Sequence, residues 1–255
     1  MTALPSAAGL TCRVVHGRME RVDRRPFAAL LLVATLVACG SAQAVERSAG
    51  PGRSTERTGP TAWVGSVRWI DPELRKILIG RNWHPGCPVP IHDLRLVTVS
   101  YWTFGGRVKQ GPLIINESVA DEVLSVFHQI FDAGFPIQKI ALAAAWRPPR
   151  PSDWYSTKNV SASFSCRPVT GQTSGFSQHA YGWAIDINPT QNPYVTGDGE
   201  VLRKACLPYL DRTQHLQGMI HRHDVVERAF AAIGWGWGGD WHSLKDYMHF
   251  SLTGT

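Results

Sequence analysis

Two short stretches in the second half of the chain contain residue types that together can bind a catalytic metal ion. Residues 177–186 read Ser-Gln-His-Ala-Tyr-Gly-Trp-Ala-Ile-Asp, and residues 246–250 read Asp-Tyr-Met-His-Phe. Together they supply two histidines and two carboxylates: His179, Asp186, Asp246 and His249. Three protein ligands of these types leave one coordination position of zinc open, which is the arrangement of hydrolytic zinc sites. A metal held in this way activates the attacking water, so no side chain has to be the nucleophile.

The spacing within the first stretch predicts how two of these side chains meet. His179 precedes an alternating segment, residues 183–187, in which Asp186 faces away from its two isoleucine neighbours. A turn at Gly182 can bring the histidine and the carboxylate to one point, whereas His249 must arrive from elsewhere in the fold. Taken singly, each residue is more often a loop, capping or core residue than a ligand. The set as a whole, with a spare carboxylate nearby, indicates the metal.

The elements that position these residues follow from hydrophobic periodicity. Strands are predicted for residues 94–101, 112–115, 137–146, 183–187 and 249–252. Amphipathic helices are predicted from Ser118, as a cap, to just before Gly134, and over residues 225–233. Residues 148–178 form a polar connection too long to be a simple turn, so we expect it to wall a functional site. Helices and strands without βαβ alternation predict a single α+β domain, with a central, mostly antiparallel sheet flanked by helices.

The composition excludes several classes of function. The chain has 255 residues, of which 44% are hydrophobic and 18% charged, which suits one globular domain with a leader. The formal net charge is +6, but the first 38 residues hold five arginines and two acidic residues, so the remainder carries only +3. Without a basic run or interleaved aromatic and basic residues, no nucleic-acid partner is expected. The Ser-x-x-Lys, Gly-x-Ser-x-Gly and His-Glu-x-x-His motifs of other hydrolases are also missing from the sequence.

Residues 1–38 have the features of a signal peptide. Arginines precede a 12-residue apolar run that is too short to span a bilayer. The run ends Leu-Val-Ala-Cys at Cys39, which resembles the lipobox of bacterial lipoproteins, where the cysteine is lipidated. Ordinary cleavage after Ala44 is the alternative, and Arg24-Arg25 resembles a twin-arginine export signal. We therefore expect an exported protein at the outer face of the cytoplasmic membrane, in the cell wall or outside the cell, with a lipid anchor as the favoured arrangement.

A flexible linker is predicted between this leader and the domain. Residues 39–62 are rich in Ser, Gly, Arg, Thr and Pro, and large apolar residues return at Trp63. Because no second linker or repeat follows, residues 63–255 are predicted to form one domain, expected to be monomeric. Three cysteines lie in it: Cys87, Cys166 and Cys206. An oxidising compartment permits one disulfide among them, and the sequence leaves the pairing open.

The motifs resemble those of the zinc D-alanyl-D-alanine carboxypeptidase family, with Ser-x-His-x-x-Gly-x-Ala-x-Asp followed by Asp-x-x-His-Phe. That family includes VanY- and VanX-type resistance enzymes and L-alanyl-D-glutamate endolysins. Longer strings, residues 164–167, 177–194 and 233–241, are similar to one carboxypeptidase-like branch. The resemblance is strong over about residues 140–255. It implies a small α+β domain with a central antiparallel sheet, as in lysostaphin-type peptidases and the hedgehog signalling domain.

The resemblance also implies roles for individual residues. Three residues match the ligands of a single zinc ion: His179, Asp186 and His249. Asp246 matches the catalytic carboxylate that moves the proton, although relatives of the dipeptidase type carry Glu there. Arg147 matches an arginine that steadies the substrate carbonyl oxygen, and Ser177 matches a residue that lines the substrate site.

The function implied is that of a zinc peptidase that trims peptidoglycan stem peptides. Removal of the terminal D-alanine is the first expectation, and cleavage between L-alanine and D-glutamate is the alternative. A different class of function is a catalytically inactive zinc domain that binds the cell wall or a partner protein, for which the hedgehog relative is the precedent. Retention of Asp246 favours the enzyme.

Overall fold

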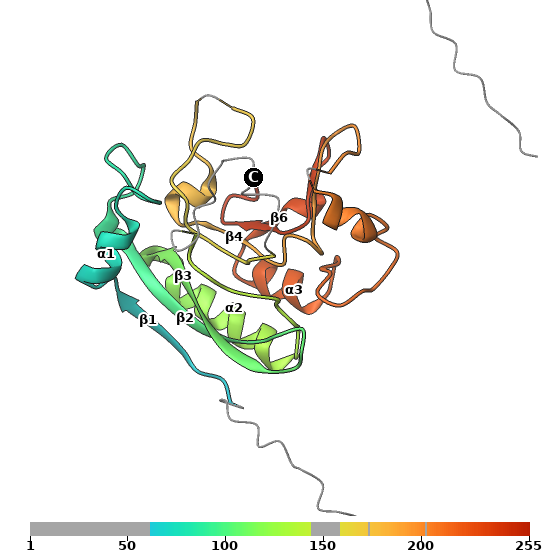
Figure 1. Ribbon diagram of the computed structural model, residues 1–255, viewed down its shortest axis with the longest axis horizontal. Coiled ribbons are helices and arrows are strands. Elements are labelled where there is room, and N and C mark those ends of the chain that lie inside the picture. Colours follow the sequence, from blue (N-terminus) through green and yellow to red (C-terminus); the bar gives the residue numbers. More distant parts are fainter. Residues whose placement is uncertain (1–61, 144–158, 173, 202) are drawn as a thin grey trace, which may run out of the picture. The chain divides into compact units, whose positions relative to one another are not determined.

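The computed structural model describes residues 62–143, 159–172, 174–201 and 203–255 (Figure 1). Within these residues the protein is an α+β domain, which confirms the predicted class, and its strands pair antiparallel in three small sheets rather than in one large one. The first sheet has the order β1 (Gly65–Trp69), β2 (Leu94–Trp102), β3 (Val108–Asn116). The second has the order β4 (Ala184–Asp186), β8 (His249–Ser251), β6 (Gly236–Trp237). The third pairs β5 (Tyr194–Val195) with β7 (Lys245–Asp246).

Helix α2 (Ala120–Asp132) packs against β2 on one side and against α3 (Val225–Ala232) on another (Figure 1). Its buried residues recur every three or four positions, as the sequence predicts: Val123, Val126, Phe127, Ile130 and Phe131. Ser118 is not the cap of this helix, because a short 3-10 turn, Glu117–Val119, precedes it. Asn116 caps that turn by accepting a hydrogen bond from the Ser118 backbone N–H at 3.0 Å. A shorter helix, α1 (Pro72–Leu78), follows β1 and is capped by Asp71.

A column of aromatic rings joins α2 to the second sheet. Phe127 of α2 meets Phe230 of α3 edge-on, with ring centroids 6.5 Å apart. Phe230 in turn stacks on Phe250 of β8 at 4.3 Å. All three rings are buried, and such aromatic pairs stabilise beyond the area that they bury. The column therefore holds β8, the strand that carries His249, against the main core.

The predicted strand over residues 137–146 is wrong for its described part. Residues 137–143 make only an isolated bridge between Ile140 and Ser161, and the Ile137 N–H donates to the Trp102 carbonyl at 2.7 Å. The segment is buried at Ile137 and Ile140, which explains the apolar pattern. An apolar run of this length does not distinguish a buried strand from a buried irregular segment.

The structure answers the question of disulfide pairing that the sequence left open. Cys87 and Cys166 form a disulfide with a Cα–Cα distance of 5.9 Å. Cys206 is a free, buried thiol, and burial raises its pKa. The disulfide ties the loop after α1 to the segment that leads towards His179.

The predicted signal peptide, with Cys39, and nearly all of the predicted linker lie outside the described residues, as does Arg147. In the described part of the chain, no helix is long and apolar enough to cross a membrane.

Candidate metal centre

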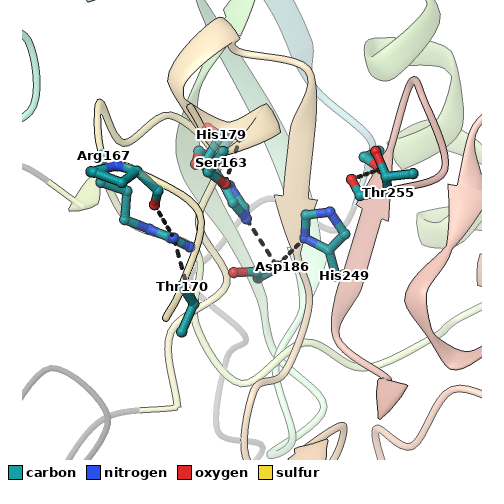
Figure 2. A network of polar contacts seen from close by, with 10 residues as sticks. Ser163, Arg167, Thr170, His179, Asp186, His249 and Thr255 are labelled. Carbon is teal, nitrogen blue, oxygen red and sulfur yellow. Dashed lines mark hydrogen bonds and ion pairs between the residues drawn. The ribbon is translucent and has the colours of Figure 1, made fainter. Parts of the chain in front are cut away.

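Two of the predicted metal ligands are cross-strand neighbours. In the antiparallel pair of β4 and β8, Asp186 stands directly opposite His249, so both side chains emerge on the same face. Their neighbours Ile185 and Phe250 are fully buried on the other face. Asp186 Oδ1 lies 3.1 Å from His249 Nδ1 (Figure 2). The alternation predicted for Asp186 is confirmed.

His179 reaches the same point from a short 3-10 helix, Gln178–Tyr181. Ser177 caps this helix, and Gly182 ends it with φ 74° before the chain enters β4. A Cβ at Gly182 would stand 2.6 Å from the Asn116 backbone nitrogen, so a side chain there has no room. The turn predicted at Gly182 is therefore present, and it brings His179 Nε2 to 3.2 Å from Asp186 Oδ1.

A hydrogen bond sets the orientation of the His179 ring. His179 Nδ1 lies 2.7 Å from the Ser163 carbonyl oxygen, which can only accept, so Nδ1 donates this hydrogen bond and Nε2 is the nitrogen that faces Asp186. Ser163 is buried, and its hydroxyl donates to the Ile114 carbonyl at 2.8 Å. Metal-binding histidines are held in this way by a second layer of partners. The role of Ser163 could not be predicted from the sequence, because a serine in a polar loop gives no local signal.

The segment before the first motif runs antiparallel beside it. Ala162 and Asp186 exchange backbone hydrogen bonds of 2.9 and 3.1 Å. The Ser165 N–H donates to the His179 carbonyl, and the Ser177 N–H donates to the Arg167 carbonyl, both at 3.1 Å. Part of the loop predicted over residues 148–178 thus forms a wall of the site, as expected.

The donor atoms of the three residues suit a zinc ion. One ligand atom each from His179, Asp186 and His249 lie within 4.8 Å of one another. Two imidazole nitrogens and one carboxylate oxygen are a donor set that zinc favours. The histidines are 3% and 5% exposed, while the Asp186 side chain is 24% exposed, so the cluster is accessible from the carboxylate side. His249 Nε2 is buried without a hydrogen-bond partner in the described part of the chain, which leaves Nδ1 as its engaged atom.

The electrostatics of Asp186 match its place between two imidazoles. Burial by itself would raise the pKa of its carboxyl group. The charges and hydrogen bonds of His179 and His249 outweigh burial and hold the pKa below its usual range. The carboxylate is therefore ionised and available as a ligand.

Asp246 is positioned by two other segments and is near enough to the cluster for the charges of Asp186 and His249 to act on it. It lies in β7, where it pairs with Tyr194 of β5, and a Cβ at Gly238 would stand 2.5 Å from its carbonyl oxygen. Its Oδ1 is buried and has no hydrogen-bond partner within the described residues. Burial, followed by the charge of Asp186, raises the pKa of Asp246 to about 7, although His249, Arg167 and a backbone hydrogen bond act in the opposite direction. A carboxyl group with a near-neutral pKa in a polar site is a candidate general acid and base.

The structure gives the other candidate site residues positions outside the metal cluster. Asp240, a second carboxylate six residues before Asp246, forms a surface ion pair with Arg222. Ser177 is buried and caps the helix of His179, so the structure gives it a local structural role, and its contact with substrate stays a prediction. A second group, His84 with Cys87 and Cys166, has metal-like spacing, but its sulfurs are joined in the disulfide and offer no thiolate.

Comparison with known proteins agrees with this geometry. Residues 170–252 match the model of a family described as D-alanyl-D-alanine carboxypeptidase. The matched segment contains all three candidate ligands together with Ser177 and Asp246. No solved structure matches the chain.

Proposed function

We propose that this chain, whose residues 170–252 match the model of a family described as D-alanyl-D-alanine carboxypeptidase, is a zinc metallopeptidase that removes the terminal D-alanine from peptidoglycan stem peptides. The peptidases of this family depend on zinc, which supports the assignment at the level of a metallopeptidase. The observation that carries the proposal is the convergence of His179, Asp186 and His249. The charges of Asp186 and His249 act on Asp246, whose buried Oδ1 has no hydrogen-bond partner among the described residues.

The three candidate ligands share one task in this function, which is to hold the zinc ion. His179 Nε2, His249 Nδ1 and the Asp186 carboxylate would hold the ion, since these atoms already face one another. Zinc, when bound, supplies a Lewis acid that makes water acidic at neutral pH and polarises a substrate carbonyl. The hydrogen bond from His179 to Ser163 keeps the imidazole in the tautomer that can bind metal.

Asp246 is the group that transfers a proton from the attacking water to the leaving amine. Its Oδ1 is available because no described residue occupies it. In the metal-free protein burial raises the pKa of Asp246 to about 7, which favours a group that both accepts and releases a proton. It takes a proton from the attacking water and then delivers that proton to the amine that leaves. Arg147 is proposed to steady the carbonyl oxygen and Ser177 to line the substrate site, both on the resemblance of their sequence positions.

The test is hydrolysis of defined stem peptides by the purified protein. Peptides ending in D-alanyl-D-alanine are incubated with the protein under three conditions: as isolated, with a chelator, and after zinc is restored. The products are identified by mass spectrometry. Release of one alanine, lost with chelator and regained with zinc, is expected. A cut between L-alanine and D-glutamate would instead select the endopeptidase. Intact peptides under every metal condition would contradict a peptidase activity and would favour a non-catalytic, zinc-containing domain that binds the cell wall.

We also propose that the mature protein is exported, monomeric and anchored by a lipid on Cys39. The support is the lipobox-like sequence that precedes the linker. Intact-mass analysis of the membrane fraction tests this, because lipidation leaves Cys39 as a modified N-terminus, whereas cleavage after Ala44 leaves an unmodified shorter chain. Replacement Cys39→Ala is expected to release the protein from the membrane fraction.

A further inference from the structure

Arg167 is a cationic side chain at the edge of the candidate metal centre for which the proposed mechanism has no task. It is the last residue of the segment that runs beside the first motif, and its carbonyl accepts the Ser177 N–H at 3.1 Å. Figure 2 shows its guanidinium group on the side of the site towards which one oxygen of Asp186 points. Its positive charge acts on the buried Asp246 carboxyl group. Arg167 therefore borders the open side of the Asp186 carboxylate.

The backbone of Arg167 is fixed from both sides. The preceding residue, Cys166, is bonded to Cys87 and donates its N–H to the Asn82 carbonyl at 3.0 Å. The following residue, Pro168, forms an antiparallel bridge with Phe176. A long flexible side chain on such an anchored backbone loses less freedom when it binds a ligand, which favours a binding role.

The hydrogen bonds of the guanidinium leave one of its edges available. Nη1 donates to the Pro168 carbonyl and to Thr170 Oγ1, each at 3.1 Å. Within the described residues these are its hydrogen bonds, so the edge formed by Nε and Nη2 is not engaged there. That edge offers two parallel N–H groups, which is the geometry that binds both oxygens of one carboxylate.

The charges around this edge also favour an anion. Asp246, when ionised, would repel a carboxylate that entered the site with the substrate, whereas the charge of Asp186 would be offset by a bound zinc ion. A guanidinium held beside them offsets this repulsion at one place, which would fix both the position and the direction of the substrate. Lys245 does not serve this purpose, because its Nζ is directed to the Gly239 carbonyl at 3.1 Å.

From this geometry we infer that Arg167 binds the α-carboxylate of the substrate residue whose amine leaves. The inference rests on the proposed peptidase function and deepens it. In a peptide ending in D-alanyl-D-alanine this group is the terminal carboxylate. In the L-alanyl-D-glutamate linkage it is the α-carboxylate of D-glutamate, which stays free because the stem continues through the γ-carboxyl group. Both bonds thus present the same anion one carbon from the leaving nitrogen, and amidation of either removes it.

The test measures binding rather than turnover. Asp246→Asn protein loaded with zinc is titrated calorimetrically with two matched pairs of peptides. The first pair ends in D-alanyl-D-alanine as the free acid or the amide, and the second contains L-alanyl-γ-D-glutamate as the α-acid or the α-amide. The amide cannot form the charge-assisted hydrogen bonds that the carboxylate forms with a guanidinium. In one of the two pairs we therefore expect the acid to bind at least about tenfold more tightly than the amide. The pair that shows this preference identifies the residue that Arg167 recognises.

Substitutions in the same background assign the preference to Arg167. Arg167→Gln is expected to bring the acid-to-amide ratio close to one, and Arg167→Lys to give an intermediate ratio, since lysine keeps the charge without the fork. Arg107→Gln, which removes an exposed arginine from the β2–β3 turn, is the matched control for lost charge and is expected to keep the full ratio. Thermal unfolding shows whether each variant folds. If the Gln variant does not fold, the Lys variant decides.

Equal affinities for acid and amide in both pairs would overturn the inference, as would a preference that Arg167→Gln and Arg167→Lys leave intact. The proposed function is read separately, from cleavage of the same acid peptides by the unsubstituted protein. A protein that cleaves no peptide but still shows an Arg167-dependent preference would contradict the peptidase and retain the carboxylate site. A protein that cleaves acid and amide at equal rates, with equal affinities, would retain the peptidase and remove the role of Arg167.

Discussion

Asp186 Oδ1 lies 3.1 Å from His249 Nδ1 although 63 residues separate the two in the chain. The register of β4 and β8 produces this contact, because residues 186 and 249 are directly opposed in an antiparallel pair. Both strands bury their other face, with Ile185 and Phe250 in the core. A slip of one residue would turn the ligands inward and the core residues outward. The hydrophobic core thereby specifies the register that assembles the metal ligands.

Replacement Asp246→Asn should separate chemistry from metal binding. The amide keeps the shape of the side chain but cannot accept the proton, so turnover is expected to fall by about 10²–10⁴. The zinc content, measured by elemental mass spectrometry, should stay unchanged because Asp246 is not in the ligand cluster. Asp240→Asn, at a surface ion pair, is the matched control and should keep its activity. A variant Asp246→Asn with full activity would remove Asp246 from the mechanism.

The stability of the metal-free protein should depend on pH in two separate windows. Because the pKa of Asp246 is raised from 3.8 to about 7, the folded protein holds an extra proton between these values, and its unfolding free energy should fall as the pH rises through that window. The pKa of Asp186 is lowered, so its stabilising contribution is present above about pH 4 and is lost in more acidic solution.

Urea unfolding in the presence of a chelator checks the assignment of the upper window. The parent protein and Asp246→Asn are compared from pH 4.5 to pH 8, with Asp240→Asn as the control. The Asn variant should lose most of the decline above about pH 4, because its side chain does not titrate. Parallel curves for the parent and Asp246→Asn would show that this carboxyl group has an ordinary pKa.

Gly182 is predicted to be essential for the position of His179. Alanine there must adopt a φ of 74° and would place its Cβ 2.6 Å from the Asn116 nitrogen. The left-handed conformation alone costs about 1–2 kcal/mol, and the close contact adds to it. We expect Gly182→Ala to lower both stability and zinc affinity. Gly199→Ala, at φ 87° with open space around it, is the control for conformation alone and should leave zinc affinity unchanged. Equal zinc affinities for the two variants would mean that this turn does not position the ligand.

The disulfide should contribute to stability independently of the metal. It joins cysteines 79 residues apart, and closing a loop of this length typically contributes about 2–5 kcal/mol. Double replacement Cys87→Ser with Cys166→Ser is therefore expected to lower the unfolding free energy by that amount. Peptide mapping without reduction should recover Cys87 joined to Cys166, with Cys206 as a free thiol. A disulfide to Cys206 would contradict the pairing.

The parts of the site that could be predicted from sequence are those with short-range patterns. The spacing of His179 and Asp186 around Gly182, and the alternation of β4, are local features, and the structure has them. The pairing of β4 with β8 is non-local, so the sequence offered only the resemblance as a guide to His249. Ser163 contacts His179 through its backbone carbonyl, and backbone pairing with Ser177 brings Arg167 to the site. No residue pattern indicates such contacts. The segment at Ile137 was predicted as a strand because burial alone produces the same apolar run.

Zinc stoichiometry shows whether His179, Asp186 and His249 form a metal centre. The purified protein is loaded with zinc, dialysed and measured by elemental mass spectrometry, together with His179→Ala, Asp186→Asn, His249→Ala and the surface control His128→Ala. We predict one zinc ion per chain in the parent and in His128→Ala, and little or none in the three ligand variants, because each leaves only two protein ligands. Zinc retained at full stoichiometry by all three ligand variants, or absent from the parent, would mean that these three residues do not form a zinc site.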